Sequence, residues 1–471
     1  MLWSLLKRHF ILFPFIKIHS AIDSRIFPAK QRQTPGKTAT LIIYYDILPV
    51  RRSLLDMVLI ERNVETIVKD TLKDTPIEVI QGARQVGKST LALMATSDIK
   101  RLCITLDSDE SLAAAKENPY EFVSQYQEGL LIIDEIQKCP ELLNALKRSV
   151  DNDRRPGRYL ITGSSNIQHL RGASESLAGR AETVVLEPFS VGEINGIKED
   201  FVSSLLCGDI IGILKKATPL SRAAYAGLIT RGGYPEAIDR AGKRRSAWFR
   251  NYAARVLDHD ADELSGLTHL DRLNKLYRVL AGDPSKIYIK ANVAHLVGIP
   301  ESSMNGYIRL LQDLCLIHSL PAWGNSYSRR AINKPKIIVS DTGMASSLNG
   351  ISHDFIANIE NGNALGPLLE NFVISEINKQ RAWSDAVYSL FHYRDRDGKE
   401  VDLVLELEGG QIIALEIKAA SSFSRSDFSS LKALRDIVGN RFYCGIVLYT
   451  GTEAQPFGDR LFAAPISTVW Q

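Results

Sequence analysis

The sequence predicts an α/β protein built around a parallel sheet, followed by further domains. Between residues 60 and 186, short apolar runs alternate with stretches of helical pattern, as expected when helices cross over between parallel strands. A glycine-rich loop joins the first apolar run to a helix. The pattern changes after residue 365, and a chain of 471 residues is long enough for roughly two to four domains.

Five apolar runs are expected to form the strands of this sheet. The run at residues 130–133 is apolar without interruption, which is typical of a parallel strand buried on both faces. A helix is expected to begin at Lys88, directly after the glycine-rich loop. The predicted strands are residues 77–80, 102–106, 130–133, 159–162 and 183–186.

The pattern after the sheet is first helical and then mixed. Residues 190–266 read as helices with a break at residues 232–235, where two glycines and a proline occur. Residues 270–323 are expected to form three short helices that lead into a β ribbon. The elements predicted for the last part are a helix at 367–380, a strand-turn-strand unit at 401–418, a helix at 426–438 and a strand at 443–449.

The composition is that of a soluble globular protein, with 45% hydrophobic and 24% charged residues. The net charge of +3 is small, so nucleic-acid binding would need a local basic face rather than bulk charge. None of the five cysteines forms a CxxC pair, so neither a zinc site nor a disulfide framework is expected, and reduced thiols favour the cytoplasm. No apolar run is long enough to span a membrane.

Residues 1–55 are basic and apolar, with Asp23 and Asp46 as their only acids. The apolar stretch at 10–16 is short and interrupted by Pro14, and no convincing cleavage site of small residues follows it. Three interpretations remain open: a weak targeting segment, a membrane-surface arm, and a poorly ordered extension. The extension is favoured, and a start site assigned too far upstream would produce the same pattern.

The glycine-rich loop has the spacing of a P-loop, G-x-x-x-x-G-K-[ST], with a predicted strand before it and a helix after it. Backbone N–H groups of such a loop and the helix N-terminus bind phosphate, Lys88 is expected to contact the β- and γ-phosphates, and Ser89 to ligate Mg²⁺. The sequence therefore predicts a nucleoside triphosphate site, with ATP and Mg²⁺ as the cofactors. Its binding residues are Gly82, Ala83, Arg84, Gln85, Val86, Gly87, Lys88, Ser89 and Thr90.

Two further segments are expected to complete this site for hydrolysis. The strand at 130–133 ends in Asp134, a candidate Mg²⁺ ligand, and Glu135, a candidate general base for the attacking water. The strand at 159–162 ends in small polar residues that could place Ser165 or Asn166 near the γ-phosphate. Arg180 could neutralise charge in the transition state, either in its own subunit or in a neighbouring one, which would need a homo-oligomer.

The strand-turn-strand unit places a second set of charged side chains together. A three-residue loop at 408–410, with Gly410 free to adopt a left-handed conformation, pairs Leu407 with Gln411 and therefore Asp402 with Glu416. Lys418 lies on the same face as Glu416 because it is two residues further along the strand. Two carboxylates can hold a Mg²⁺ ion and a lysine can orient or deprotonate water, and Glu370 on the preceding helix could add a third carboxylate.

From about residue 60 to its end, the chain resembles the bacterial and archaeal AAA+-type ATPases that carry a C-terminal domain of unknown function with a restriction-nuclease-like core. The resemblance rests on GARQVGKST, LLIIDEIQK, YLITGSSN, LAGRAETVVLEPFSVGEI, GGYPEAI, KPKIIVSDTGMA, LGPLLENFVISEI and GKEVDLVLE…ALEIK. It implies ATP rather than GTP. The pair Asp402…Glu416-x-Lys418 matches the D…ExK arrangement of the PD-(D/E)xK nucleases. The alternative is a retained nuclease fold that does not cleave, whose residues serve only structure or bind nucleic acid or protein.

The resemblance also implies a winged helix between the two larger domains. Its recognition helix would be residues 301–313, with a core stripe of Met304, Ile308 and Leu311. The exposed face carries Glu301, Arg309 and Asp313, which does not suit phosphate. The ribbon after it is more basic, so DNA contact through the wing and a pure packing role are both left open. The basic residues of this ribbon are Arg329, Arg330, Lys334 and Lys336.

These observations define two function hypotheses. In one, ATP turnover controls a metal-dependent domain that cuts DNA. In the other, the chain is a nucleotide-dependent switch that binds partner protein or DNA without cutting. The expected domains are an extension at 1–55, a P-loop ATPase core at 56–188, a helical lid at 189–266, a winged helix at 267–340 and a nuclease-like α/β domain at 341–471.

Overall fold

A computed structural model of the full chain gives the fold. It describes residues 59–164, 167, 173–261, 270–324 and 334–471. The predicted extension at 1–55 lies outside these residues, as do Ser165, Asn166, Arg329 and Arg330.

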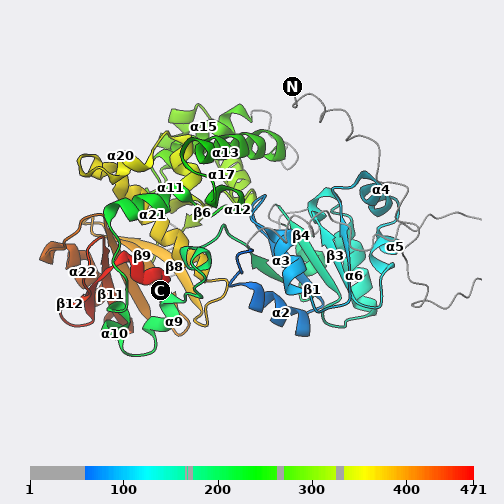
Figure 1. Ribbon diagram of the computed structural model, residues 1–471, viewed down its shortest axis with the longest axis horizontal. Helices are drawn as coiled ribbons and strands as arrows, with labels where there is room; N and C mark the ends of the chain where they lie inside the picture. The colour runs from blue at the N-terminus through cyan, green and yellow to red at the C-terminus, as the bar shows by residue number, and fades with distance from the viewer. Residues whose placement is uncertain (1–58, 165–166, 168–172, 262–269, 325–333) are drawn as a thin grey trace, which may run out of the picture. The chain divides into compact units, whose positions relative to one another are not determined.

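The first sheet has five parallel strands in the order β2-β3-β4-β1-β5 (Figure 1). The prediction of a parallel sheet is confirmed, because all five apolar runs form strands within two residues of their expected ends. Strand β4 lies between β1 and β3. The strands are β1 (Ile77–Gln81), β2 (Arg101–Thr105), β3 (Leu130–Asp134), β4 (Tyr159–Gly163) and β5 (Ala181–Val185).

Helices cover both faces of this sheet because successive residues of its central strands are buried in two different cores. Ile80 of β1 packs in a core with α2 and α3, whereas Val79 packs in a core with α5 and α6. Asn118 begins α5 by accepting the Glu121 N–H. The helices are α2 (Glu65–Asp74), α3 (Lys88–Ala95), α4 (Asp109–Glu117), α5 (Pro119–Ser124), η1 (Ile136–Lys138), α6 (Leu142–Asn152) and α7 (Ala173–Leu177).

The expected helical stretch follows β5, and several of its short helices begin at a capping side chain. Ser190 forms a capping box with Glu193, and Asp200, Asp209 and Ser221 each accept a backbone N–H of the first turn. The predicted break falls between α11 and α12. The helices are α8 (Val191–Ile194), α9 (Phe201–Leu205), α10 (Ile210–Leu214), α11 (Arg222–Arg231), α12 (Pro235–Ile238), α13 (Gly242–Arg255) and the π-helix η3 (Val256–Asp260).

Three helices and a two-stranded antiparallel ribbon come next, in the order that the sequence predicts. They are α15 (Asp271–Gly282), α16 (Lys290–Val297), α17 (Met304–Asp313), β6 (Ile317–Leu320) and β7 (Lys336–Val339). The predicted core stripe of α17 is partly wrong. Ile308 is only half-buried, and Tyr307 and Leu310 are buried beside Met304 and Leu311, because the apolar face of α17 turns further round the helix.

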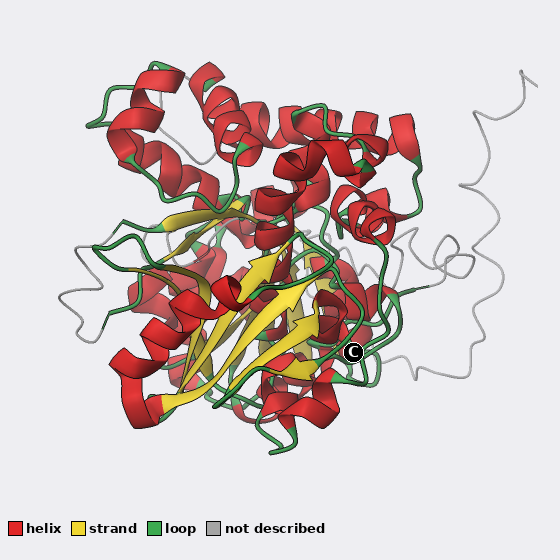
Figure 2. Cartoon of the chain, turned by 90° about the vertical axis from the view of Figure 1, so that its left-hand side faces the viewer, coloured by secondary structure: helices red, strands yellow, loops and turns green. Residues whose placement is uncertain are grey.

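The last part of the chain forms a six-stranded mixed sheet in the order β12-β13-β11-β10-β9-β8. Figure 2 shows strands in a twisted layer with helices packed against it. The elements are α19 (Thr342–Leu348), α20 (His353–Ala357), η4 (Ile359–Asn361), α21 (Gly362–Gln380), β8 (Tyr388–Arg394), β9 (Glu400–Leu407), β10 (Ile412–Lys418), η5 (Arg425–Phe428), α22 (Ser429–Val438), η6 (Gly439–Arg441), β11 (Phe442–Tyr449), β12 (Gln455–Pro456), β13 (Leu461–Pro465) and η7 (Ile466–Trp470).

One predicted helix boundary in this part is wrong. Helix α21 begins at Gly362, so Pro367 lies inside it rather than at its start. Pro367 is the sixth residue of α21, beyond the first four N–H groups that lack an intrahelical acceptor, so it removes one hydrogen bond from within the helix.

The β9–β10 hairpin has the predicted register. Leu415 pairs with Leu403 and Ile413 with Leu405, and the Leu407 N–H donates to the Gln411 carbonyl at 2.8 Å. Gly410 has φ +83°, the left-handed conformation that the three-residue loop requires. Alternate residues then face opposite layers: Leu403 packs with α21, and Val404 packs with α22. This alternation is interrupted at residues 402–403, because the pairing of β8 with β9 shifts register there and Val401 packs in the same core as Val404.

Among the residues that the structure describes, no helix has both the length and the apolar character needed to cross a membrane.

The buried Glu78 of β1 gives a pH-dependent prediction for stability. Burial raises the pKa of Glu78 to about 9, and the nearby Glu182 carboxylate adds to this shift. Because the folded pKa is above the unfolded value, the folded state keeps a proton that the unfolded state has lost. The contribution of Glu78 to the free energy of unfolding is therefore greatest below pH 4.5, and it falls as the pH rises towards 9. We expect Glu78→Gln to raise the thermal unfolding midpoint more at pH 8.5 than at pH 5.5, by about 2–4 °C for each kcal/mol.

Thermal scans at both pH values measure this difference. Glu117→Gln, at an exposed carboxylate on α4, is the matched control and should shift neither midpoint. Equal midpoint shifts for Glu78→Gln at the two pH values would show that its carboxyl is not protonated in the folded state.

Candidate functional site

The predicted P-loop lies between the end of β1 and the start of α3. Gly87 has φ +99°, and Gln85, which is not a glycine, has φ +61°. A Cβ atom on Gly82 would lie 2.2 Å from the carbonyl oxygen of Leu186, so only glycine fits there. The loop therefore depends on a close approach between its first residue and the chain that follows β5.

Lys88 begins α3 and points back into this loop. Its side chain is buried, and Nζ donates to the carbonyls of Gly82 at 3.1 Å and Ala83 at 3.0 Å. Burial lowers the pKa of Lys88, and the carboxylates of Glu135 and Asp134 oppose that shift. An anionic phosphate in the loop would stabilise this ammonium group in the same way.

Asp134 lies opposite the start of α3. The Ser89 hydroxyl donates to its Oδ1 at 2.8 Å, and the Thr162 hydroxyl donates to the same oxygen. Burial raises the pKa of Asp134, although both hydroxyl groups favour its charged form. The serine and carboxylate predicted to hold Mg²⁺ are thus adjacent, and their oxygen atoms fit the preference of this ion for oxygen ligands.

Glu135 has a left-handed backbone, with φ 60° and ψ 48°. Its N–H donates to the Thr162 hydroxyl at 3.2 Å, and its carboxylate accepts a hydrogen bond from the Gln137 amide. The same amide donates to the Ser164 hydroxyl at 2.8 Å. A glutamate in this conformation is strained, and such strain persists where neighbouring contacts fix the position of a side chain.

A small pocket lies beside these residues. Its lining includes Arg84, Glu135, Gln137 and Asp260. Arg84 of the P-loop pairs with Asp260 of η3 at 2.7 Å, so this π-helix meets the P-loop at the wall of the pocket. Short π-helical segments occur frequently at functional sites.

The structure brings together Lys88, Ser89, Asp134 and Glu135, but two other predicted residues need separate accounts. Asn166 lies outside the described residues. The same-subunit role predicted for Arg180 is wrong. Its carbonyl accepts from the Ile77 N–H at the start of β1, whereas the P-loop follows the other end of that strand, about 16 Å away for five residues. A role for Arg180 in a neighbouring subunit stays a prediction.

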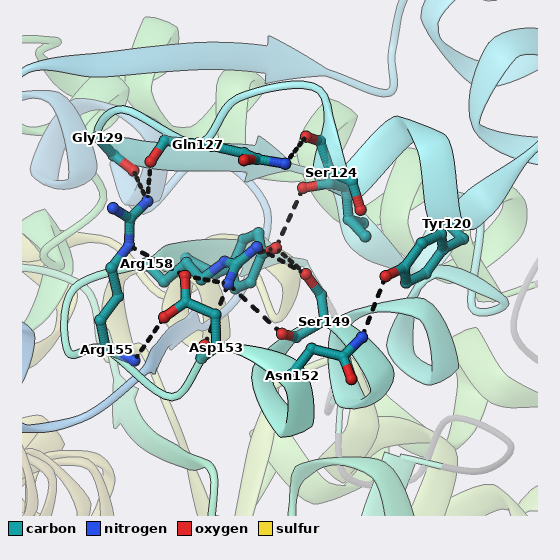
Figure 3. Close-up of polar contacts among 11 residues, drawn as sticks. Tyr120, Ser124, Gln127, Gly129, Ser149, Asn152, Asp153, Arg155 and Arg158 are labelled. Carbon is teal, nitrogen blue, oxygen red and sulfur yellow. Dashed lines mark hydrogen bonds and ion pairs between the residues drawn. The ribbon is translucent and has the colours of Figure 1, made fainter.

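Arg180 belongs to a group of ion pairs and hydrogen bonds that stabilises the edge of the sheet where the strands begin. Arg180 pairs with Asp151 at 2.6 Å, near the end of α6. Figure 3 shows the neighbouring network, in which Arg158 reaches Ser149 and Asp153, and Arg155 reaches the carbonyl of Gly129. These bonds join the end of α6 to the starts of β3 and β4.

The predicted C-terminal cluster, Asp402, Glu416 and Lys418, also comes together. Lys418 Nζ lies 2.7 Å from Glu416 Oε1, and Asp402 Oδ2 accepts the Ile417 N–H at 2.8 Å. Burial raises the pKa of Asp402 and raises that of Glu416 to about 8; the Glu400 carboxylate adds to the shift of Asp402, and the Asp402 carboxylate adds to the shift of Glu416. Glu416 Oε2 is buried without a hydrogen-bond partner. These two carboxylates fit a cation.

Lys336 forms an ion pair with Glu370, the carboxylate that was predicted to be a third metal ligand. It was predicted to be a basic residue of a DNA-binding wing, but its side chain is only 2% exposed. Its Nζ lies 2.8 Å from Glu370, 2.7 Å from Glu400 and 3.8 Å from Asp402. Burial acts to lower the pKa of Lys336, but these carboxylates together raise it. The wing prediction is wrong for this residue because its charge is used inside the protein.

Glu370 is therefore an ion-pair partner rather than a free metal ligand. Burial raises the pKa of Glu370, and the Lys336 ammonium opposes that shift. Among the described residues, no group of three or more histidine, cysteine, aspartate or glutamate side chains is arranged to hold a metal ion. The predicted three-carboxylate site is not formed, and a cation would depend on Asp402 and Glu416.

Sequence reasoning missed four residues at these sites: Thr162, Gln137, Asp260 and Lys336. Thr162 lay inside the stretch that was considered, and its place at the end of β4, the strand beside Asp134, was the signal that could have found it. Lys336 and Asp260 lie far along the chain from their partners, at separations of 34 residues or more. No local pattern marks such contacts.

Family models match three parts of the chain. They are an AAA domain at residues 74–195, the Domain of unknown function (DUF8612) at 222–354 and the Domain of unknown function (DUF4143) at 365–469. The first match, together with the parallel sheet and its loop, establishes an AAA-type P-loop ATPase domain. The match at 365–469 assigns no nuclease core.

Two relatives are uncharacterized proteins of Mycobacterium bovis and Mycobacterium tuberculosis. Each is 27% identical over 414 residues, which cover 88% of this chain and 85% of the relative. Among solved structures, a Walker-type ATPase of Pyrococcus abyssi is similar with a TM-score of 0.36 and 13% identity, covering 62% of this chain and 96% of that one. AMPPCP-bound DnaA from Aquifex aeolicus gives 0.26 and 14%, covering 52% and 86%. Likeness at this level carries no functional inference.

The Lys336 network gives a prediction for stability. Lys336→Met removes the ammonium from three carboxylates that remain mostly buried, so we expect a loss of about 3–5 kcal/mol. Adding Glu370→Gln to that variant removes one of the uncompensated charges and should recover part of the loss. Chemical denaturation of the single and double variants measures both effects.

Lys334→Met is the matched control, since Lys334 is exposed and lies two residues earlier. The double variant being no more stable than Lys336→Met alone would contradict a direct interaction between Lys336 and Glu370.

Proposed function

We propose that this chain binds ATP with Mg²⁺ at residues 82–90 and hydrolyses it. The observation that carries this proposal is the convergence of four side chains from two separate segments, the start of α3 and the end of β3: Lys88, Ser89, Asp134 and Glu135. The AAA-domain match over residues 74–195 supports the same reaction. ATP is preferred because the family that the sequence resembles uses it.

Each residue has a distinct role in the proposed reaction. The N–H groups of the loop and the Lys88 ammonium bind the β- and γ-phosphates. Ser89 and Asp134 would hold Mg²⁺, which supplies charge neutralisation at the phosphates when bound. The Glu135 carboxylate accepts the proton of the attacking water, and Gln137 orients that carboxylate. Thr162 fixes Asp134 and the Glu135 backbone at once, so it positions both groups.

Two substitutions separate binding from hydrolysis. Lys88→Ala should weaken ATP binding by about a hundredfold or more, because a buried charged contact to phosphate is lost. Glu135→Gln should leave ATP binding within a few-fold of the original but slow hydrolysis by about 10²–10⁴. Equilibrium binding of a fluorescent ATP analogue and phosphate release measure the two quantities.

Glu141→Gln, at an exposed carboxylate close in sequence, serves as the control and should change neither quantity. Normal hydrolysis by Glu135→Gln would remove the general-base assignment.

A second activity is supported by the C-terminal cluster. We propose that Asp402 and Glu416 bind a divalent cation and that Lys418 orients the attacking water, so that nucleotide state controls cleavage of DNA. The unpartnered Glu416 Oε2 favours this proposal. The Lys336 network favours the alternative, a switch that binds partner protein or DNA without cutting, because Lys336 already neutralises part of the charge.

The two alternatives differ in one measurement. The full chain is incubated with duplex and single-stranded DNA, ATP, and Mg²⁺ or Mn²⁺, and the DNA is examined by gel electrophoresis. Cleavage that is lost in Asp402→Ala and in Lys418→Ala supports the nuclease, with Asp397→Ala as an exposed control. If every DNA substrate stays intact while ATP is still hydrolysed, the non-cleaving switch is the function that remains.

A further inference from the structure

Helix α13 concentrates positive charge in a chain that is otherwise nearly balanced. Its sequence, GKRRSAWFRNYAAR, has five basic residues and no acidic residue over 14 positions, whereas the whole chain has a net charge of +3. One of the five has a structural use. Arg245 donates to the carbonyls of Ala237 and Ile238, near the end of α12.

The other four basic residues lie on one exposed face. With 3.6 residues per turn, Lys243 and Arg250 lie about 20° apart round the helix, as do Arg244 and Arg255, and all four fit within about 140°. All are exposed, and none makes an ion pair or a side-chain hydrogen bond with another described residue. We call these four residues the α13 basic face.

The opposite face of α13 is fixed to the nucleotide site. Phe249, Tyr252 and Ala253 are buried, and the Tyr252 hydroxyl donates to the carbonyl of Arg84 in the P-loop at 2.9 Å. The helix therefore presents its cations from a rigid support. Asp258, one turn beyond Arg255, is exposed and ends the basic face.

We propose that the α13 basic face binds the phosphate backbone of double-stranded DNA. The four cations make no pair with another described residue, and they span an axial length of about 18 Å, which matches about five base pairs of a duplex. The positions between them are Ala247, Asn251 and Ala254, so the face has no large apolar side chain to insert into a membrane. It also has no exposed aromatic ring, the group on which bases of single strands stack. Trp248 is half-buried and stacks on Tyr252.

This inference deepens the proposed action on DNA by naming the surface, but it needs neither ATP turnover nor cleavage. It adds a DNA contact to that of the predicted wing, from which the structure removes Lys336 because that side chain is buried. Binding to the DNA backbone alone has no sequence preference. Its affinity decreases as the salt concentration rises, and the slope of log K against log salt is proportional to the number of phosphates contacted.

The test measures fluorescence anisotropy of a labelled 20-base-pair duplex with the full chain, without ATP and without divalent cation. The salt concentration is varied between about 50 and 200 mM. In the quadruple variant, Lys243, Arg244, Arg250 and Arg255 are each changed to glutamine. We expect at least tenfold weaker binding, and a plot of log K against log salt that is less steep by about 3–4. Arg250→Gln alone should reduce the slope by about 0.9.

A control variant removes the same charge elsewhere by changing exposed Lys198, Lys215, Lys216 and Arg396 to glutamine. It should bind the duplex within about threefold of the unchanged protein. Retained ATP-analogue binding and an unchanged circular dichroism spectrum confirm that both quadruple variants are folded.

Three results would overturn the proposal: an unchanged slope in the quadruple variant and in Arg250→Gln, an equal loss in the control variant, or no binding of the duplex by the unchanged protein. Binding of phosphatidylserine vesicles that depends on α13, in place of DNA binding, would also overturn it. ATP hydrolysis by the unchanged protein is measured separately, so a failure here is distinct from a failure of the ATPase.

Discussion

Arg62 fixes the position of the P-loop relative to the chain that leaves the first sheet. Its side chain is 7% exposed, and it donates to the carbonyl of Val86 at 3.1 Å, to the carbonyl of Glu187 at 2.7 Å and to Glu193 Oε1 at 3.0 Å. Its guanidinium group also lies 4.4 Å from the centre of the Phe189 ring. A buried guanidinium is tolerated only when its N–H groups are bonded, so the loop, the segment after β5 and the chain before α2 must be arranged together.

The segment held by Arg62 is held from its other side by α21. Lys379 Nζ donates to the carbonyl of Phe189 at 3.0 Å, and Glu376 Oε2 accepts the N–H of Val191 at 2.7 Å. Six residues earlier on the same helix, Glu370 binds Lys336. One rigid helix thus carries contacts to the segment beside the P-loop and to the charged residues beside Asp402. A displacement of the P-loop must be absorbed in these buried bonds or be passed to α21.

Much of the fold could be predicted because its signals are local. Buried parallel strands need continuous apolar residues, and this requirement is visible at β3 without any knowledge of its neighbours. The β9–β10 register follows from a three-residue loop and the alternation of side chains, so the approach of Asp402 and Glu416 was also predictable. The P-loop belongs to the same class, because a few adjacent residues specify its backbone.

The predictions of functional residues that were wrong concern side chains whose partners lie far along the sequence. Arg180 occurs in a motif that suggested catalysis, but its location depends on the pairing of β5 with β1, which places it at the opposite end of the strands from the P-loop. Lys336 had the composition of a surface cation, but three carboxylates from α21 and β9 surround it. A basic residue can be assigned to a nucleic-acid surface only after its ion pairs are known. By this criterion Lys336 is removed from the predicted wing, whereas four cations of α13 have no ion pair within the part of the chain that the structure describes, and the fifth, Arg245, bonds to backbone carbonyls.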